Sequence, residues 1–213
     1  MDNSLICKSK FCFTRETINY FKKLTTIGYT PNKNGSITQK EIAGKLIVKN
    51  QEKRPFELNV DLGSIILGEE EGVDIVPGLY NFHSHPKEAY KKYKVDLAWP
   101  SNQDYVGFML AVLEDHTLCH VVITIEGIYI ISLTTEWFNN PLKLDKKFGK
   151  FIMKKYDISC GKVKTIDEYL SICGNIKYNN TGPLIDVQYL SWNNPYKPFN
   201  IIFGKRNSKC LIN

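Results

Sequence analysis

The stretch 78–86, GLYNFHSHP, decides how we expect the chain to fold. Its first six residues have the apolar and aromatic content of a β-strand, and this strand leads directly into His83-Ser84-His85-Pro86. Side chains two positions apart in extended backbone point to the same side. The imidazoles of His83 and His85 can therefore reach one ion, and the end of this strand is a candidate metal site.

A second motif, Pro100-Ser101-Asn102-Gln103-Asp104, opens an amphipathic helix that we predict over residues 102–116. Ser101 can cap this helix, and Asp104 suits both a capping box and the helix dipole. Beside the two histidines, the same carboxylate completes the three protein ligands of a catalytic zinc site, which keeps its fourth position for water. Zinc lowers the pKa of such a water towards about 7 and polarises a carbonyl oxygen.

A metal-bound water also needs a group that takes its proton and returns it to the leaving amine. Glu41, in the segment Glu41-Ile42-Ala43-Gly44-Lys45-Leu46, is our candidate for this role. The run Glu69–Glu71 lies nearer to the histidines in the sequence, in a polar turn, and is the alternative. Ser101 can donate a hydrogen bond to a tetrahedral oxyanion in addition to capping the helix.

Together these motifs resemble the signature of the JAMM, or MPN+, metalloproteases. In that signature Glu-x-x-Gly-x-Leu precedes His-Ser/Thr-His-Pro, which is followed by Pro-Ser-x-x-Asp. The resemblance implies a fold like that of the cytidine deaminases, a curved mixed sheet flanked by helices. It further implies that zinc is the cofactor, and it assigns five site residues: His83, His85 and Asp104 as metal ligands, Glu41 as general acid and base, and Ser101 at the oxyanion.

The spacing departs from the family pattern. The family usually leaves about ten residues between the second histidine and the aspartate, whereas eighteen lie between His85 and Asp104. Asp96 stands at the usual spacing, but it does not open a helix and Tyr93 occupies the place of the serine. We therefore interpret residues 87–98 as an enlarged loop beside the metal, with Asp96 as the alternative third ligand, and we expect the polar stretch 87–99 to be exposed.

The remaining patterns predict an α/β chain in which helices and strands alternate. The resemblance covers roughly residues 14–135, so we expect a metalloprotease-like domain over 1–135 and a C-terminal α+β extension over 136–213, a possible docking element. Residues 40–49 suit either a strand or a helix end. The other expected elements are helices at 14–26, near 143–156 and at 165–174, and strands at 56–60, 118–125, 128–134, 184–191 and 198–203.

Composition narrows the class of protein. A hydrophobic fraction of 43% and a charged fraction of 23% are typical of a soluble globular chain. No apolar run approaches the roughly 18 residues of a membrane span, and we recognise no secretory signal, so we expect an intracellular, cytoplasmic protein. The six cysteines include no Cys-x-x-Cys pair and are expected to be free thiols. A second metal site at His116, Cys119 and His120 is a weaker possibility.

The resemblance implies a zinc-dependent hydrolase of amide or isopeptide bonds, a deubiquitinase-like metallopeptidase that acts on proteins or peptides, including ubiquitin-like conjugates. Enzymes of this family often need a protein partner for activity. Only three of the 28 basic residues are Arg, which disfavours nucleic acid as a partner. A ubiquitin-type substrate presents a basic face, so a chain of net charge +6 requires an acidic cleft, for which Glu69–Glu71 is the candidate.

The alternative function is a non-catalytic scaffold of the MPN fold, or a virion or assembly protein. The excess of Lys, Asn and Ile resembles the composition of proteins from large DNA viruses, and for such a source the expected location is the host cytoplasm or the virion.

Overall fold

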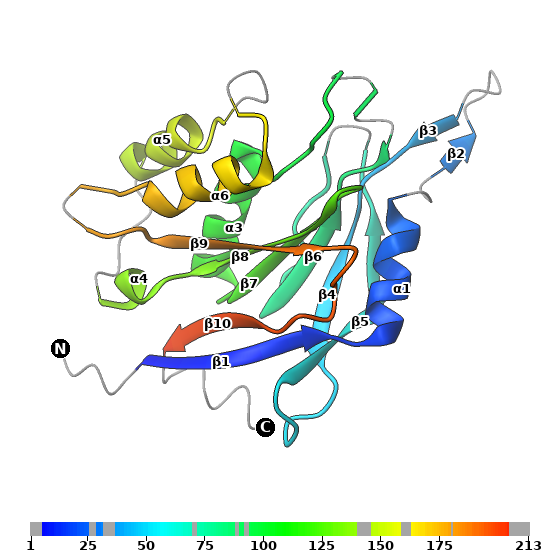
Figure 1. Ribbon diagram of the computed structural model, residues 1–213, viewed down its shortest axis with the longest axis horizontal. Helices are drawn as coiled ribbons and strands as arrows, with labels where there is room; N and C mark the ends of the chain where they lie inside the picture. The colour runs from blue at the N-terminus through cyan, green and yellow to red at the C-terminus, as the bar shows by residue number, and fades with distance from the viewer. Residues whose placement is uncertain are drawn as a thin grey trace.

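The computed structural model describes residues 6–25, 29–31, 37–69, 72–87, 90–91, 94–139, 146–158, 163–179 and 181–204. Its centre is one mixed sheet of eight strands in the order β10-β1-β5-β4-β6-β7-β8-β9 (Figure 1). The strands are β1 (Ile6–Phe13), β4 (Ile42–Val48), β5 (Phe56–Leu67), β6 (Tyr80–Ser84), β7 (Cys119–Ile123), β8 (Gly127–Leu133), β9 (Ile185–Ser191) and β10 (Phe199–Gly204). A two-stranded sheet pairs β2 (Tyr29–Pro31) with β3 (Ile37–Gln39).

The sheet curls until its two edge strands nearly meet. Gln188 of β9 donates from Nε2 to the carbonyl of Asn200 in β10 at 2.8 Å, and the amide of Asn200 donates back to Gln188 Oε1 at 3.0 Å. The pairs β1–β5 and β6–β7 are parallel, and the remaining pairs are antiparallel. The predicted mixed α/β class is confirmed.

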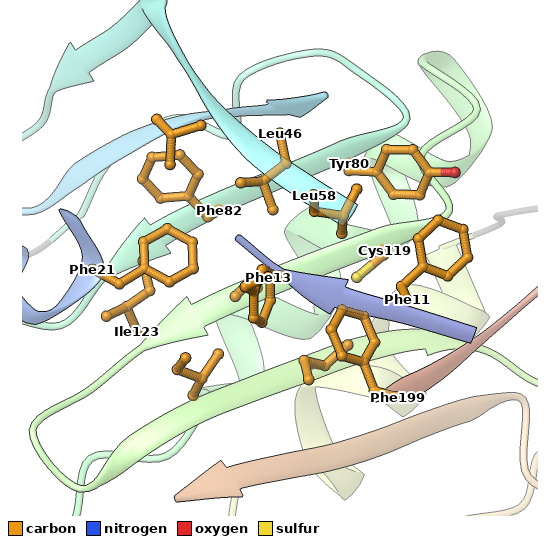
Figure 2. Packing of buried hydrophobic residues seen from close by; sticks show 14 of the residues in the cluster. Phe11, Phe13, Phe21, Leu46, Leu58, Tyr80, Phe82, Cys119, Ile123 and Phe199 are labelled. Atoms are coloured by element: carbon orange, nitrogen blue, oxygen red, sulfur yellow. The ribbon is translucent and has the colours of Figure 1, made fainter. Parts of the chain in front are cut away.

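Every strand of this curled sheet turns apolar side chains into one inner core. Because side chains alternate along a strand, β6 contributes Tyr80 and Phe82, and β7 contributes Cys119, Val121 and Ile123. Figure 2 shows their rings and branched chains meeting Phe11 and Phe13 of β1 and residues of β4, β5 and β10. The residues between them on β6 and β7 face the other way, and these include His83.

Helices cover both faces of the sheet (Figure 1). Helix α1 (Arg15–Leu24) is capped by Thr14 and packs Ile18, Phe21 and Leu24 into the inner core. A second core on the outer face of β7 and β8 contains Tyr105 and Phe108 of helix α3 (Asn102–Glu114). The helices on this outer side are α3 (Asn102–Glu114), α5 (Lys146–Lys155) and α6 (Ile166–Asn175), and the short helix α4 (Thr135–Asn139) follows β8.

Most predicted elements are confirmed within a few residues, and the structure adds the following details. Residues 42–48 form a strand, which settles the choice left open for 40–49. The predicted strand at 56–60 continues to Leu67 as one long β5. The turn-rich segment after α1 contains β2, and α4 was not predicted. The domain boundary that we predict after residue 135 falls inside α4, and both strands after it complete the same sheet. A docking role for 136–213 stays a prediction.

The predicted exposure of residues 87–99 is wrong at two aromatic residues. Tyr90 and Trp99 are 8% and 6% exposed. The hydroxyl of Tyr90 donates to the carboxylate of Glu126, and the ring of Trp99 stacks on Tyr169 while its Nε1 donates to the carbonyl of Ile158 at 3.0 Å. An indole or phenol ring can be buried when its polar atom has a hydrogen-bond partner. The polar residues that surround Tyr90 and Trp99 in the sequence provide no sign of this burial.

Two expectations from composition can be compared with the described residues. Their cysteines, Cys7, Cys12, Cys119 and Cys173, are free thiols, as predicted. Within the same residues, none of the helices combines the length and the apolar character that crossing a bilayer requires.

Candidate metal centre

Three side chains from two parts of the chain converge at the end of β6. His83 lies in β6, His85 directly follows it, and Asp104 lies in the first turn of α3. Nε2 of His83 is 3.0 Å from Nε2 of His85 and 3.1 Å from Oδ1 of Asp104, and Nε2 of His85 is 3.5 Å from Oδ2 of Asp104. The structure therefore brings together the three residues that the sequence predicts as ligands.

These separations fit one metal ion. In a tetrahedral zinc site with ligand bonds of about 2.0–2.1 Å, neighbouring ligand atoms lie about 3.4 Å apart. The three observed separations, 3.0, 3.1 and 3.5 Å, lie near that value. Two imidazoles and one carboxylate are also the donor set of catalytic zinc sites, in which the fourth position stays open.

The second nitrogen of each histidine ring has a partner of its own. Nδ1 of His85 lies 2.8 Å from the carbonyl oxygen of Ala98. Because a carbonyl only accepts, His85 carries a proton on Nδ1, which leaves Nε2 as the ring atom that can bind a metal. Nδ1 of His83 lies 2.8 Å from Nε2 of His120. Metal-binding histidines usually have such outer partners, which fix the orientation of the ring.

Without a metal ion the site attracts a proton. Burial by itself would lower the pKa of His85, but the hydrogen bond and the charge of Asp104 outweigh it and raise this pKa to about 9. Burial by itself would raise the pKa of Asp104, yet the neighbouring charge of His83 and the hydrogen bonds to both rings hold it well below the usual value. The site thus favours a cation between the three groups, and a divalent metal can replace the proton.

Asp104 also closes a capping box at the start of α3. The amide of Ser101 donates to Asp104 Oδ2 at 2.6 Å, and the amide of Asp104 donates to Ser101 Oγ at 3.3 Å. The carboxylate therefore caps the helix with Oδ2 and faces His83 with Oδ1. Ser101 is exposed and lines a cleft into which the metal centre opens, described below, and its oxyanion role stays a prediction.

Glu41 borders the same cleft, just before β4. In the antiparallel pair of β4 and β6, Ala43 lies opposite His83, so continuing the register by two residues places Glu41 opposite His85. The amide of Ile42 donates to Ser84 Oγ at 3.1 Å and fixes this approach. Burial raises the pKa of Glu41, and the charges of His83 and His85 offset this rise only in part. A carboxylate with a raised pKa beside a metal site suits a general base.

The glycine that follows Glu41 by three positions has a packing role. A Cβ on Gly44 would lie 2.7 Å from Ile65 and 2.9 Å from the ring of Phe82, so no side chain fits there without movement. The register between β4 and β5 also shifts between Ala43 and Lys45. Glycine thus leaves room on β4 for the side chains of Ile65 and Phe82, a physical reason for the predicted Glu-x-x-Gly spacing.

The metal centre opens into a cleft of about 810 Å³ with an acidic lining. Within the described part of the chain, no Lys or Arg lines this cleft. The carboxylates that line it are Glu41, Asp74, Asp104, Glu114 and Asp115. The acidic surface that we predicted at Glu69–Glu71 has a different origin, because Glu69 is an exposed partner of Lys40 and residues 70–71 lie outside the described residues.

The structure separates the alternatives left open by the sequence. Asp96 is exposed and does not belong to the converging group, whereas Asp104 does. The second metal site is wrong for the described residues, because His116 is exposed at the end of α3 while the alternation of β7 sends Cys119 and His120 to opposite faces. His120 contacts the first site instead. The sequence contained one signal for this contact: His120 lies inside an apolar strand, and a buried polar side chain needs a hydrogen-bond partner.

Comparisons with known proteins leave the family open. A scan against models of known protein families finds no match, and no solved structure matches the chain. Among curated proteins, the chain is 34% identical over 74 residues to "Uncharacterized protein 3R" of Frog virus 3 (isolate Goorha). This similarity covers 35% of the chain and 16% of the viral protein. The printed name of that relative states no activity, so the assignment of function depends on the site itself.

Proposed function

We propose that this protein is a zinc-dependent hydrolase of amide or isopeptide bonds, of the JAMM type. The observation that carries the proposal is the convergence of His83, His85 and Asp104 at one point within an acidic cleft, with Glu41 on its border. A zinc ion bound there would supply an activated water and a polarised carbonyl oxygen. Glu41 would take the proton of that water and return it to the departing amine.

The acidic cleft supports a substrate that carries positive charge near the bond to be cleaved. Opposite charge raises the local concentration of a ligand and its rate of association. Peptide segments rich in Lys or Arg, including the tails of ubiquitin-like modifiers, are the substrate class we propose. The cytidine-deaminase-like arrangement of the sheet belongs to the same proposal, and a requirement for a protein partner stays a separate prediction.

A cleavage panel tests this function. The metal-free purified protein is reloaded with one equivalent of Zn²⁺ and incubated with lysine-rich peptides, ubiquitin-like conjugates and acidic peptides of equal length. We expect cleavage of the basic substrates that needs the metal. Glu41→Gln should abolish turnover and keep the zinc, His83→Ala should lose both, and Glu69→Gln, a carboxylate outside the cleft, should change neither.

Two outcomes would contradict the proposal. Full turnover by Glu41→Gln would remove Glu41 as the general base. Failure of the wild-type protein to retain stoichiometric zinc would remove the metal site itself and leave the scaffold function as the better explanation.

A further inference from the structure

Three polar side chains lie next to one another on the outer face of β6 and β7. Asn81 and His120 are fully buried, and His83 is 3% exposed. In the parallel pair of these strands, Asn81 lies beside His120, and the alternation of β6 places His83 on the same face. A buried polar group without a partner destabilises the fold, so these three residues need hydrogen-bond partners in the folded chain.

The direction of these hydrogen bonds is set at the end remote from the metal site. Thr117 Oγ1 donates to the carbonyl of Gly78 at 2.8 Å, and a carbonyl can only accept. Asn81 Nδ2 then donates to the carbonyl of Val76 at 3.2 Å and to Thr117 Oγ1 at 3.4 Å. The amide of Asn81 is thereby oriented with its Oδ1 towards His120.

The direction of each further hydrogen bond, from Asn81 through His120 to His83, follows from the bond before it. Oδ1 of Asn81 accepts only, and it lies 2.6 Å from Nδ1 of His120, so this nitrogen carries the proton. With its proton on Nδ1, the ring of His120 presents Nε2 as its acceptor. His83 Nδ1, at 2.8 Å, therefore donates to His120, which leaves Nε2 of His83, 3.1 Å from Asp104 Oδ1, as the atom that can bind a metal.

We propose that Asn81 and His120 form a buried hydrogen-bond relay that holds His83 in its metal-binding tautomer. Both are positioning residues, since they act on the metal through His83. This inference rests on the proposed metal site and extends it to two residues outside the predicted signature. Loss of such outer partners typically costs about 10–100-fold in metal affinity.

Variants at His120 separate this role from simple packing. In His120→Phe the ring volume remains but the acceptor is lost, so His83 can move its proton to Nε2 and donate it to Asp104. We expect Zn²⁺ affinity, measured by competition with a chelating dye, to fall about 10–100-fold. His120→Gln offers one acceptor to His83 and one donor to Asn81, so it should restore most of the affinity. His116→Asn, which removes an exposed histidine, should bind like the wild type.

Nitrogen-15 NMR of the histidine rings in the metal-free wild-type protein tests the relay without any variant. We expect a neutral His120 protonated on Nδ1 and a His83 protonated on Nδ1. A proton on Nε2 of His120 would overturn the relay, as would equal zinc affinity of His120→Phe and the wild type. The ring measurement decides the relay even if the wild type binds no zinc, a result that would overturn the metal site alone.

Discussion

The two halves of the metal centre come from regions that are built very differently. β6 is a five-residue strand, buried throughout and paired on both sides, and it presents His83 from the middle of the sheet. Residues 95–101 have irregular backbone. They supply the carbonyl of Ala98 that orients His85, and they lead into the first turn of α3, which supplies Asp104. A central strand fixes its ligands by backbone pairing, whereas the irregular region needs side-chain anchors.

Glu126, in the turn between β7 and β8, is the main anchor of that irregular region. Its carboxylate accepts from the hydroxyl of Tyr90, from the amide of Ala98 at 2.9 Å and from the hydroxyl of Tyr129 at 3.2 Å. The carbonyl of the same Ala98 accepts from His85. One carboxylate thereby connects the enlarged loop to the sheet and, through a single residue, to the metal site.

The largest expected effect concerns Asp104, the ligand that follows the irregular region. Asp104→Asn keeps an acceptor for the amide of Ser101, so α3 stays capped, but it removes the negative charge that faces both histidines. We expect Zn²⁺ affinity to fall by at least about 100-fold, the upper range for loss of a supporting contact. Asp96→Asn is the matched control and should bind zinc normally. The reverse pattern, with Asp96 essential and Asp104 dispensable, would break the comparison.

The capped helix and the strand beside it were predictable because each carries a local signal. Ser101 and Asp104 form the capping box that their spacing predicts, and the His-x-His alternation holds at His83. The path of residues 87–98 was not predictable, because the burial of Tyr90 depends on Glu126, which is 36 residues away. The role of His120 depends on the parallel register of β6 and β7, which no local pattern reveals.

The pH dependence of metal binding tests the pairing of His85 with Asp104. The raised pKa of His85, about 9, means that zinc must displace a proton from its Nε2. Zinc affinity should therefore rise by up to about tenfold per pH unit between roughly 6.5 and 9 and then level off. The stability of the metal-free protein should show the opposite trend with pH. A raised histidine pKa stabilises the fold below about pH 6.5, and this contribution is lost as the pH rises through 9.

Titrations with Zn²⁺ at pH 6.5, 7.5 and 8.5, paired with thermal unfolding of the metal-free protein, measure both trends. A zinc affinity that does not change across this range would show that no proton is displaced and would contradict the assigned role of Asp104 at His85.

The smallest expected effect concerns the anchor. Glu126→Gln leaves one acceptor oxygen for the three donors, so at least one donor loses its partner and the carbonyl of Ala98 loses its fixed position. We expect zinc affinity to fall about tenfold, with faster hydrogen exchange at the amide of Ala98. Glu52→Gln, an exposed carboxylate, is the control. If Glu126→Gln exchanges and binds like the wild type, the irregular region holds its shape without this anchor.

X-ray absorption at the zinc edge tests the central claim most directly. On the wild-type protein loaded with one equivalent of Zn²⁺, we expect two imidazole nitrogens and additional oxygen at about 2.0–2.1 Å, without sulfur. Scattering by a thiolate at about 2.3 Å, or a shell of oxygens without imidazole, would contradict the assignment of His83, His85 and Asp104 as the ligands.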